Sequence, residues 1–459
     1  MTASISNFRV SGLFGFRNYF ITFQNNTLII VGENGSGKTT LLRMLFYFLS
    51  GRWQSLIQFK FNYIEAKIDG QEFKVTREEL IKAFKSGGQR FLSKFPLPIR
   101  DRIMDLISRG QIERIPDDIM HLGSRLGIPS LMLERDLMRF LADEDGLSTG
   151  LRPPKEIREA MSGIKKTMNA QILYLPTYRR IERELGSIFE GASPDDLQRH
   201  QQRQLESDRS YIELVEFGMK DVQRAVDRAV GSIRDFARES LNKLTLSYLS
   251  DVVNQTYLEA DISTILAVPP ETVRSVIDRI DDSILQAESK DHLCEVIGSL
   301  ATKTEEMTDH ERLVYHYFST ILRFQESLQQ LERPISEFCE LCNQYISDKL
   351  FTYNSSTFSF SIIDRDRSDL DRIELADLSS GEKQIVSLFS HLYLSKTSKF
   401  FVLIDEPELS LSVPWQRRFL PDIRNGQFCA GIVAVTHSPF VYDNNLKEYA
   451  YSLNEFFEI

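Results

Sequence analysis

The segment that most constrains the fold of this chain is GENGSGKT at residues 32–39, which fits the phosphate-loop pattern G-x-x-x-x-G-K-[ST]. An apolar run, TLIIV at residues 27–31, precedes it, and a helical apolar pattern follows it from residue 41. This strand–loop–helix context favours a true phosphate loop over a chance match. Glycines let backbone N–H groups turn toward phosphate oxygens at the start of a helix, so the segment predicts an α/β nucleotide-binding fold.

Two side chains of this segment carry specific chemistry. The Lys38 ammonium can reach β- and γ-phosphates, and the Thr39 hydroxyl can hold Mg²⁺. The full set of candidate nucleotide ligands here is Asn34, Gly35, Ser36, Gly37, Lys38, Thr39 and Thr40.

Two acids follow a second apolar run near the C-terminus, FFVLI at residues 400–404. Five apolar residues bounded by charge predict a buried parallel strand, and Asp405 and Glu406 stand at its C-terminal end, where ligands bind in open α/β sheets. Asp405 is placed to hold Mg²⁺ through water, and Glu406 to polarise an attacking water as a general base. Taken alone, the two acids fit a strand that ends in a solvated turn equally well.

A third apolar run, GIVAVT at residues 431–436, ends at His437. A lone histidine is usually structural, but one at the tip of the next core strand can reach a γ-phosphate. The series of motifs, more than any one of them, indicates a nucleotide site.

The ordered series resembles the ABC-type ATPase module. Its parts here are the phosphate loop, LSSGEKQ at 378–384, the strand that ends in Asp-Glu, PELS at 407–410 and THS at 436–438. The expected fold class is therefore α/β: an ABC-type P-loop ATPase head with a large helical, short coiled-coil insertion.

The resemblance implies ATP and Mg²⁺ as cofactors and a head-to-tail dimer. Ser379 and Gly381, with Glu382 beside them, would act in trans on the γ-phosphate held by the partner's phosphate loop. The segment 407–410 would communicate between the two sites, and His437 would be the γ-phosphate switch. The glutamine loop of the module is not located, because Gln171 precedes the strand 172–175 instead of following it.

The middle of the chain is expected to be mostly helical. Apolar residues step by four and three through 215, 219, 222, 226, 229, 233 and 236, as in a heptad seam. A second seam is longer, and Pro334 within it should kink the helix or break it into two. Antiparallel pairing of the two helices would make an arm of about 45 Å for thirty residues. The second seam comprises Val314, Tyr317, Ile321, Phe324, Leu328, Leu331, Ile335, Phe338, Cys342 and Tyr345.

These patterns divide the chain into five parts. Residues 1–75 form an N-terminal ATPase lobe, 76–170 a mostly helical insertion, 171–200 a return strand and loop of the head, 201–350 the helical arm pair with its cap, and 351–459 the C-terminal ATPase lobe.

Two further patterns have an ordinary structural explanation. Cys339 and Cys342 could form a zinc hook between two subunits, but Cys342 continues the seam and the chain has no second ligand pair, so a core position is favoured. The aromatic residues of the segment 14–20 (FGFRNYF) are favoured as a β-sheet surface, with an adenine platform as the alternative.

Composition limits the function. A net charge of −10 and a pI near 5.4 argue against a generally cationic nucleic-acid coat, although local basic surface at residues 179–180 and 417–418 remains open. No apolar run approaches the ~20 residues needed to cross a bilayer. The four cysteines show no disulfide-like framework, so a cytoplasmic protein without a membrane partner is expected.

A second resemblance covers the insertion. YLPTYRRIE at 174–182 and VEFGMKDV at 215–222 look like the ATPase subunit of Septu-type bacterial antiphage systems, the PtuA-like family. That implies a small HNH nuclease partner of the PtuB kind, with DNA reached through the complex. The seven histidines form no H-N-H or H-x-E cluster, and only about twenty residues follow His437, so no intrinsic nuclease is expected.

The expected function is thus an ATPase subunit that regulates an associated HNH nuclease. A DNA-repair ATPase of the RecF or Rad50 kind would share the head and arms but act on DNA directly. A transporter's ATP-hydrolysing subunit would need a membrane partner and a much shorter insertion.

Overall fold

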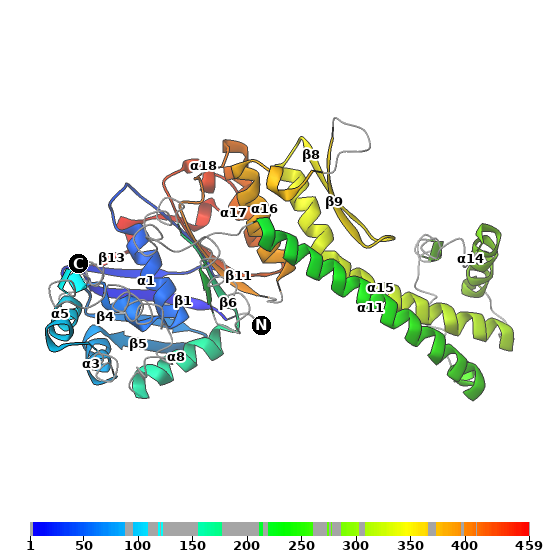
Figure 1. Ribbon diagram of the computed structural model, residues 1–459, viewed down its shortest axis with the longest axis horizontal. Coiled ribbons are helices and arrows are strands. Elements are labelled where there is room, and N and C mark those ends of the chain that lie inside the picture. Colours follow the sequence, from blue (N-terminus) through cyan, green and yellow to red (C-terminus); the bar gives the residue numbers. More distant parts are fainter. Residues whose placement is uncertain are drawn as a thin grey trace. The chain divides into compact units, whose positions relative to one another are not determined.

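The computed structural model describes residues 3–87, 95–108, 118–119, 121–122, 155–176, 211–213, 219–259, 273–274, 277, 286–302, 308–365, 373–395, 399–409 and 411–458. The chain forms two compact units (Figure 1): residues 1–216 with 397–459, and residues 217–396. No helix among the described residues is both long and apolar enough to cross a membrane.

The first unit contains a six-stranded parallel sheet in the order β12-β3-β11-β10-β6-β7. Its central strands are continuous apolar runs, as expected where a parallel sheet is covered on both faces. All six residues of β10 are buried. The strands are β3 (Thr27–Val31), β6 (Gln171–Leu175), β7 (Tyr211–Glu213), β10 (Phe400–Asp405), β11 (Cys429–Thr436) and β12 (Ala450–Ser452).

A second, antiparallel sheet of five strands belongs to the same unit, in the order β13-β2-β1-β4-β5. Alternate residues of its strands are buried, so one face of the sheet covers the core. The strands are β1 (Ile5–Leu13), β2 (Arg17–Thr22), β4 (Tyr63–Ile68), β5 (Gln71–Thr76) and β13 (Phe457–Glu458).

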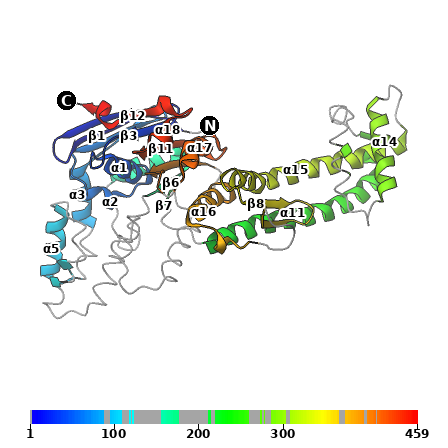
Figure 2. The ribbon, with the colours of Figure 1, turned by 90° about the horizontal axis from the view of Figure 1, so that it is seen from above.

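Helix α1 (Lys38–Ser50) lies between the two sheets (Figure 2). Its Phe48 packs edge-on against Phe8 of β1, with ring centroids 5.9 Å apart, and its Phe46 stacks on Tyr174 of β6 at 4.7 Å. A helix covered on two sides must be apolar nearly all round, and the run from Met44 to Leu49 meets that demand.

Shorter helices complete this unit. Helix α17 (Val413–Asn425) contacts β11, and its Arg424 Nε donates to Thr27 Oγ1 at 2.7 Å. Helix α8 (Lys155–Met168) packs on α1 and on β4 and β5. The others are α2 (Trp53–Ile57), α3 (Arg77–Gly87), α5 (Leu97–Ser108), α18 (Pro439–Tyr442) and the 3₁₀ turns η4 (Lys447–Tyr449) and η5 (Leu453–Phe456).

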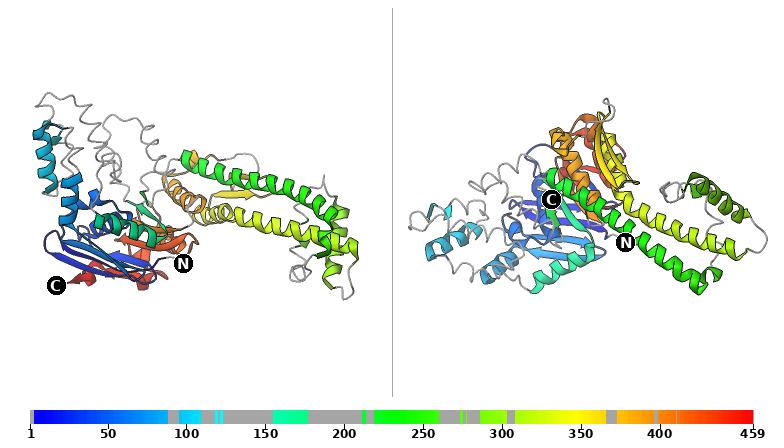
Figure 3. Two further views of the ribbon diagram at one scale, coloured as in Figure 1. Left: turned by 90° about the horizontal axis from the view of Figure 1, so that it is seen from below. Right: turned by 45° about the vertical axis from the view of Figure 1, so that its right-hand side comes forward.

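The second unit is built on two long helices, α11 (Met219–Asn254) and α15 (Asp309–Tyr345), which run side by side (Figure 3). Phe236 stacks on Phe324, and Tyr248 lies against Tyr317, with centroids 6.3 and 4.7 Å apart. Residue numbers rise along one helix as they fall along the other, so the pairing is antiparallel, as predicted. Helix α15 begins at a complete capping box between Thr308 and Glu311.

The predicted seam of α15 is only partly buried. Tyr317 and Leu331 remain 41 and 42 % exposed. Instead, a neighbouring stripe of α15 packs against α14 (Ala287–Thr302), with Phe318 and Leu322 in a small core of their own. The heptad pattern located the contact with α11 but missed this second apolar face of the same helix.

Pro334 was predicted to kink the second arm helix or to break it into two, and the break is wrong, because α15 is continuous through this residue. Proline removes one backbone donor and crowds the preceding turn. Buried residues on both sides, Leu328, Ile335 and Phe338 among them, hold the helix in place across that defect.

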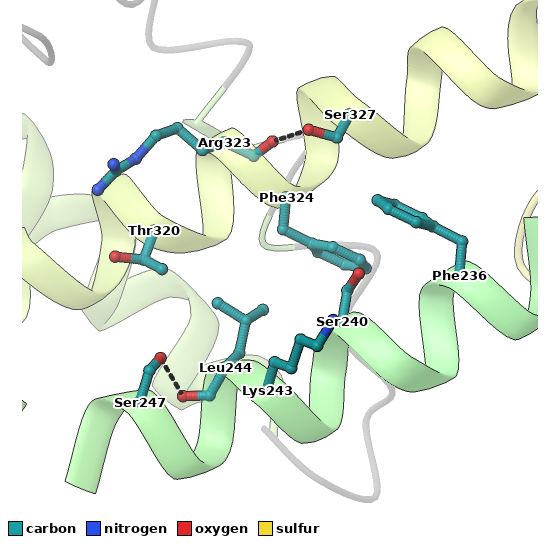
Figure 4. Close-up of a pocket in the computed structure, with 9 residues that line it drawn as sticks. All are labelled: Phe236, Ser240, Lys243, Leu244, Ser247, Thr320, Arg323, Phe324 and Ser327. Carbon is teal, nitrogen blue, oxygen red and sulfur yellow. Dashed lines mark hydrogen bonds between the residues drawn. The ribbon is translucent and has the colours of Figure 1, made fainter. Parts of the chain in front are cut away.

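A hollow between α11 and α15 is open at the middle of the arm (Figure 4). Small hydroxyl residues stand there where a tight seam would place large apolar ones. Its lining comprises Phe236, Ser240, Lys243, Leu244, Ser247, Thr320, Arg323, Phe324 and Ser327.

Most of the remaining elements of the second unit follow α15 in the chain. Strands β8 (Lys349–Asn354) and β9 (Ser359–Asp364) form a hairpin, and the turn η3 (Leu375–Asp377) leads to α16 (Ser380–Leu394). The short 3₁₀ turn η2 (Thr256–Glu259) follows α11. Both α11 and α15 pack against α16. The fold is thus a mixed α/β P-loop head with a helical insertion, as predicted, whereas the five-part division of the chain stays a prediction.

Candidate nucleotide site

The phosphate loop has the backbone that the motif requires. Gly35 and Gly37 adopt positive φ values of 79° and 105°, which other residues rarely reach, and Gly37 is the residue immediately before α1. Asn34 and Gly35 are exposed at the tip of the loop, whereas Ser36 and Thr40 are half-buried. The N-terminus of α1 is therefore open to an anion at this loop.

Lys38 is buried, and its ammonium group already lies inside the loop. The Nζ atom donates to the carbonyl oxygens of Gly32 and Glu33, each at 2.7 Å, and lies 3.4 Å from Ser36 Oγ. Burial lowers the pKa of Lys38, while three carboxylates nearby oppose that shift. The acids are Glu406, Asp405 and Glu408.

Strand register brings the distant motifs into one row. In the parallel sheet, Val31 pairs with Thr436, and Val435 pairs with Asp405. The carboxyl ends of β3, β11 and β10 therefore lie side by side at one edge, where α/β sheets bind ligands. The structure brings the phosphate loop, the two acids and His437 together, although they are almost four hundred residues apart in sequence.

At that edge the two candidate metal ligands touch. Thr39 Oγ1 donates to Asp405 Oδ1 at 2.9 Å, and the Asp405 side chain is almost fully buried. Hydroxyl and carboxylate oxygens are the donors that Mg²⁺ prefers, so this pair fits the ion that the motif implies.

Glu406 follows Asp405 in a strained conformation. Its φ of 52° lies in the left-handed region, which is unusual for a residue other than glycine and typical of functional sites. Its carboxylate Oε1 lies 3.5 Å from His437 Nε2. Burial, with Asp405 next to it, raises the pKa of Glu406, while His437 acts in the opposite direction. A carboxylate whose pKa is raised is a better proton acceptor.

The signature residues lie in the second unit, at the start of α16. Ser379 caps the helix: Glu382 N donates to Ser379 Oγ at 3.4 Å, and Ser379 N donates to Glu382 Oε2 at 2.7 Å. Glu382 Oε1 also accepts from Lys349 of β8 at 2.9 Å. In this chain Glu382 thus shapes the signature turn, and Gly381 lies in the first turn of the helix.

Arg17 and Phe14 lie next to the phosphate loop; Arg17 was not predicted from sequence, and Phe14 was predicted only as part of an alternative adenine platform. Arg17 Nη1 donates to Ser36 O at 3.1 Å, and the Phe14 ring lies 3.6 Å from where a Cβ on Gly37 would stand. Phe14 and Phe16 are 43 and 69 % exposed in the turn between β1 and β2. Their signal was the cluster of four aromatic residues around Arg17 in the segment 14–20. Of its four aromatic residues, Tyr19 and Phe20 belong to β2, whereas Phe14 and Phe16 precede it.

The cysteine pair is a core element, as favoured from the seam. Cys339 and Cys342 are 4 and 0 % exposed, and burial raises the pKa of Cys339 to about 12, which disfavours the thiolate that zinc needs. Among the residues that the structure describes, no cluster of histidines, cysteines and acids could hold a metal ion.

Some predicted features lie outside the described residues. They are the segment 177–182 with both arginines of its basic patch, Val215 of the first seam, and Ser410 at the end of the segment 407–410. The residues from 177 onward, where a glutamine loop would follow β6, belong to the same group.

Fold and site together define a P-loop ATPase head with a helical insertion. The family described as "AAA domain, putative AbiEii toxin, Type IV TA system" matches residues 115–443, and a second family, "AAA domain", matches residues 4–115. The first match covers most of the chain, which therefore belongs to this family of AAA-domain ATPases.

No curated protein matches the chain. A solved structure, the Smc head domain with an extended coiled coil bound to the C-terminal domain of ScpA, from Pyrococcus furiosus, is similar over 96 % of this chain and 92 % of that one, with 14 % identity and a TM-score of 0.34. At that score the similarity carries no argument about function.

Proposed function

We propose that the chain binds ATP with Mg²⁺ and hydrolyses it at the edge of the parallel sheet. The observation that carries the proposal is the row of strand ends that sets Lys38, the Thr39–Asp405 pair and the Glu406–His437 pair side by side. Phosphoryl transfer needs positioning and charge stabilisation more than covalent chemistry, and these groups supply both.

Each group has a part in this proposal. Lys38 exchanges its carbonyl partners for β- and γ-phosphate oxygens, and the backbone N–H groups of the loop hold the phosphates at the start of α1. Thr39 and Asp405 would hold Mg²⁺, which would supply positive charge next to the phosphates. Glu406 accepts a proton from the attacking water, and His437 beside it contacts the γ-phosphate. Phe14 lies beside the loop and is exposed, so its ring is available to the base.

The proposed active form is a head-to-tail dimer. Ser379 and Gly381 of one copy would close over the γ-phosphate of the other, with Glu382 holding the turn in shape. A nucleotide favours the closed form only through contacts that it makes there and not in the open form, and the signature supplies them. Opening and closing of the heads would then follow ATP binding and hydrolysis.

The biological setting we propose is bacterial antiphage defence of the Septu type. In this setting the ATPase restrains or releases an associated HNH nuclease of the PtuB kind, and DNA is reached through that partner. The support is the likeness of segments 174–182 and 215–222 to the PtuA-like family. The description of the matching AAA family also names a toxin of a toxin–antitoxin system.

Native purification with the neighbouring genes tests this setting. The chain is expressed with them, and the mass of the intact complex is measured with and without MgATP. A small HNH protein that co-elutes at fixed stoichiometry is the expected result, and nucleotide-dependent cleavage of DNA by the complex would follow from it. A bare dimer whose hydrolysis is stimulated by DNA would overturn the defence setting in favour of a DNA-repair ATPase.

A further inference from the structure

Glu408 is a third acid at the edge of the sheet, two residues beyond Glu406. Its carboxylate accepts three hydrogen bonds from the segment that ends β11. Oε2 accepts from Thr436 Oγ1 at 2.8 Å, and Oε1 accepts from the backbone N–H groups of His437 at 2.8 Å and Ser438 at 3.2 Å. One side chain thus joins the loop after β10 to the loop after β11.

A second side chain joins the same two loops. Gln416 of α17 donates from Nε2 to Leu411 O at 2.9 Å and accepts at Oε1 from Ser438 Oγ at 2.7 Å. Thr436 is fully buried, so its hydroxyl needs a partner within the protein, and Glu408 provides it. The short segment 436–438 is therefore fixed at both its backbone and its side chains.

The geometry points to Glu408 as the positioning residue that sets His437 opposite Glu406, by holding the backbone of residues 437 and 438. This inference rests on the proposed ATPase function, since it assigns a task within that site. Hydrogen bonds to an ionised acceptor are roughly twice as strong as neutral ones. Without them, the peptide that carries His437 could rotate, and the 3.5 Å approach of its Nε2 to Glu406 Oε1 would be lost.

The residue type matches this task. A carboxylate offers two acceptor oxygens, one for the pair of N–H groups and one for the hydroxyl, whereas an amide offers only one. The negative charge of Glu408 also acts on the site itself, because it opposes the lowering of the Lys38 pKa by burial and adds to the raising of the Glu406 pKa. Glu408→Gln keeps most of the geometry and removes the charge, whereas Glu408→Ala removes both.

Steady-state hydrolysis by five variants tests the inference. They are Glu408→Ala, Glu408→Gln, His437→Ala, the double variant Glu408→Ala/His437→Ala, and the exposed control Glu448→Ala. Glu408→Ala is expected to lower kcat about tenfold or more with little change in KM, and Glu408→Gln to retain more activity than Glu408→Ala. If Glu408 acts through His437, the double variant loses no more than His437→Ala alone.

Two outcomes would overturn this assignment. One is wild-type kcat in Glu408→Ala, and the other is a double variant whose loss is the product of the two single losses. If Glu408→Ala does not fold, Glu408→Gln is compared in the same way with His437→Ala and with the double variant Glu408→Gln/His437→Ala.

Hydrogen exchange separates this inference from the proposed function. The amides of His437 and Ser438 donate to Glu408, so a peptide that spans residues 434–440 should exchange at least about tenfold faster in Glu408→Ala and near the wild-type rate in Glu408→Gln. Unchanged exchange in Glu408→Ala contradicts the positioning role. If the wild-type protein does not hydrolyse ATP, the proposed function fails, and the exchange result still decides what Glu408 does.

Discussion

The two units of this chain build their parts of the proposed site in different ways. In the first unit, Asp405 and His437 stand at the ends of buried strands, and the register of the parallel sheet fixes where those ends lie. In the second, Ser379 and Glu382 depend on a local capping box and on one ion pair with Lys349. The positions of Asp405 and His437 thus depend on the packing of the core, whereas the signature turn depends on a few local contacts that a single substitution can change.

The largest expected effect concerns the strand-end acids. Glu406→Gln keeps the shape of the side chain but removes the general base, so kcat should fall about 10³-fold while ATP binding is retained. Phosphate release and nucleotide titration measure the two quantities, and native mass analysis should show an ATP-dependent dimer that persists. Glu448→Gln, an exposed acid of the same unit, is the matched control. Unchanged turnover in Glu406→Gln would remove this residue from the proposed role.

The next effect concerns the phosphate loop. Lys38→Ala removes a buried ammonium group that donates to carbonyl oxygens of the loop and, in the proposed complex, to phosphate oxygens of ATP. The Kd for ATP should therefore rise about 100-fold. Calorimetry with MgATP measures it, with the exposed Lys447→Ala as control. Ordinary affinity in Lys38→Ala would contradict the placement of the phosphates. The two units should differ in this respect. A substitution in α16 should not alter nucleotide binding to a single copy of the chain.

The second unit has its own sensitivity to acid. His391 of α16 is buried, and burial lowers its pKa from 6.5 to about 4. The unfolded chain therefore takes up a proton before the folded chain does as the pH falls. The stability that neutral His391 provides is complete above about pH 6.5 and is lost progressively toward pH 4, by about 3 kcal/mol in the free energy of unfolding.

His391→Leu tests this dependence, since leucine cannot take up a proton. Chemical unfolding at pH 7 and at pH 4.5 should show a smaller loss of stability on acidification for the variant than for the wild type. His310→Gln, an exposed histidine of the same unit, should leave the wild-type loss unchanged. Equal losses in His391→Leu and the wild type would mean that His391 is not the group responsible.

Much of the first unit could be predicted from sequence because its strands are short apolar runs with chemistry at their ends. The strands 27–31, 400–405 and 429–436 and the helix after Gly37 follow directly from such runs. Glu408 was placed in a communicating loop, but its contact with residues 436–438 depends on the register of β10 against β11. A linear pattern does not contain that register.

The second unit was harder to predict for a related reason. Heptad spacing identifies one contact face of a helix, and it found the pairing of α11 with α15. Phe318 and Leu322 lie on a second face, toward α14, and Pro334 is tolerated because of burial on both sides of it. Such effects come from tertiary packing, which overrides local propensity.

The smallest expected effect separates the two roles of Ser379. As a helix cap it contributes about 1 kcal/mol, so Ser379→Ala should lower the free energy of unfolding by that amount. Ser379→Asn keeps a good cap and costs little stability, but its larger amide would not fit against a γ-phosphate. If Ser379 acts in trans, both variants lose the ATP-dependent dimer that Glu406→Gln otherwise traps, although only one loses stability. A dimer that survives in Ser379→Asn would leave Ser379 with the cap alone, and the second unit would then contribute to the site only through its backbone.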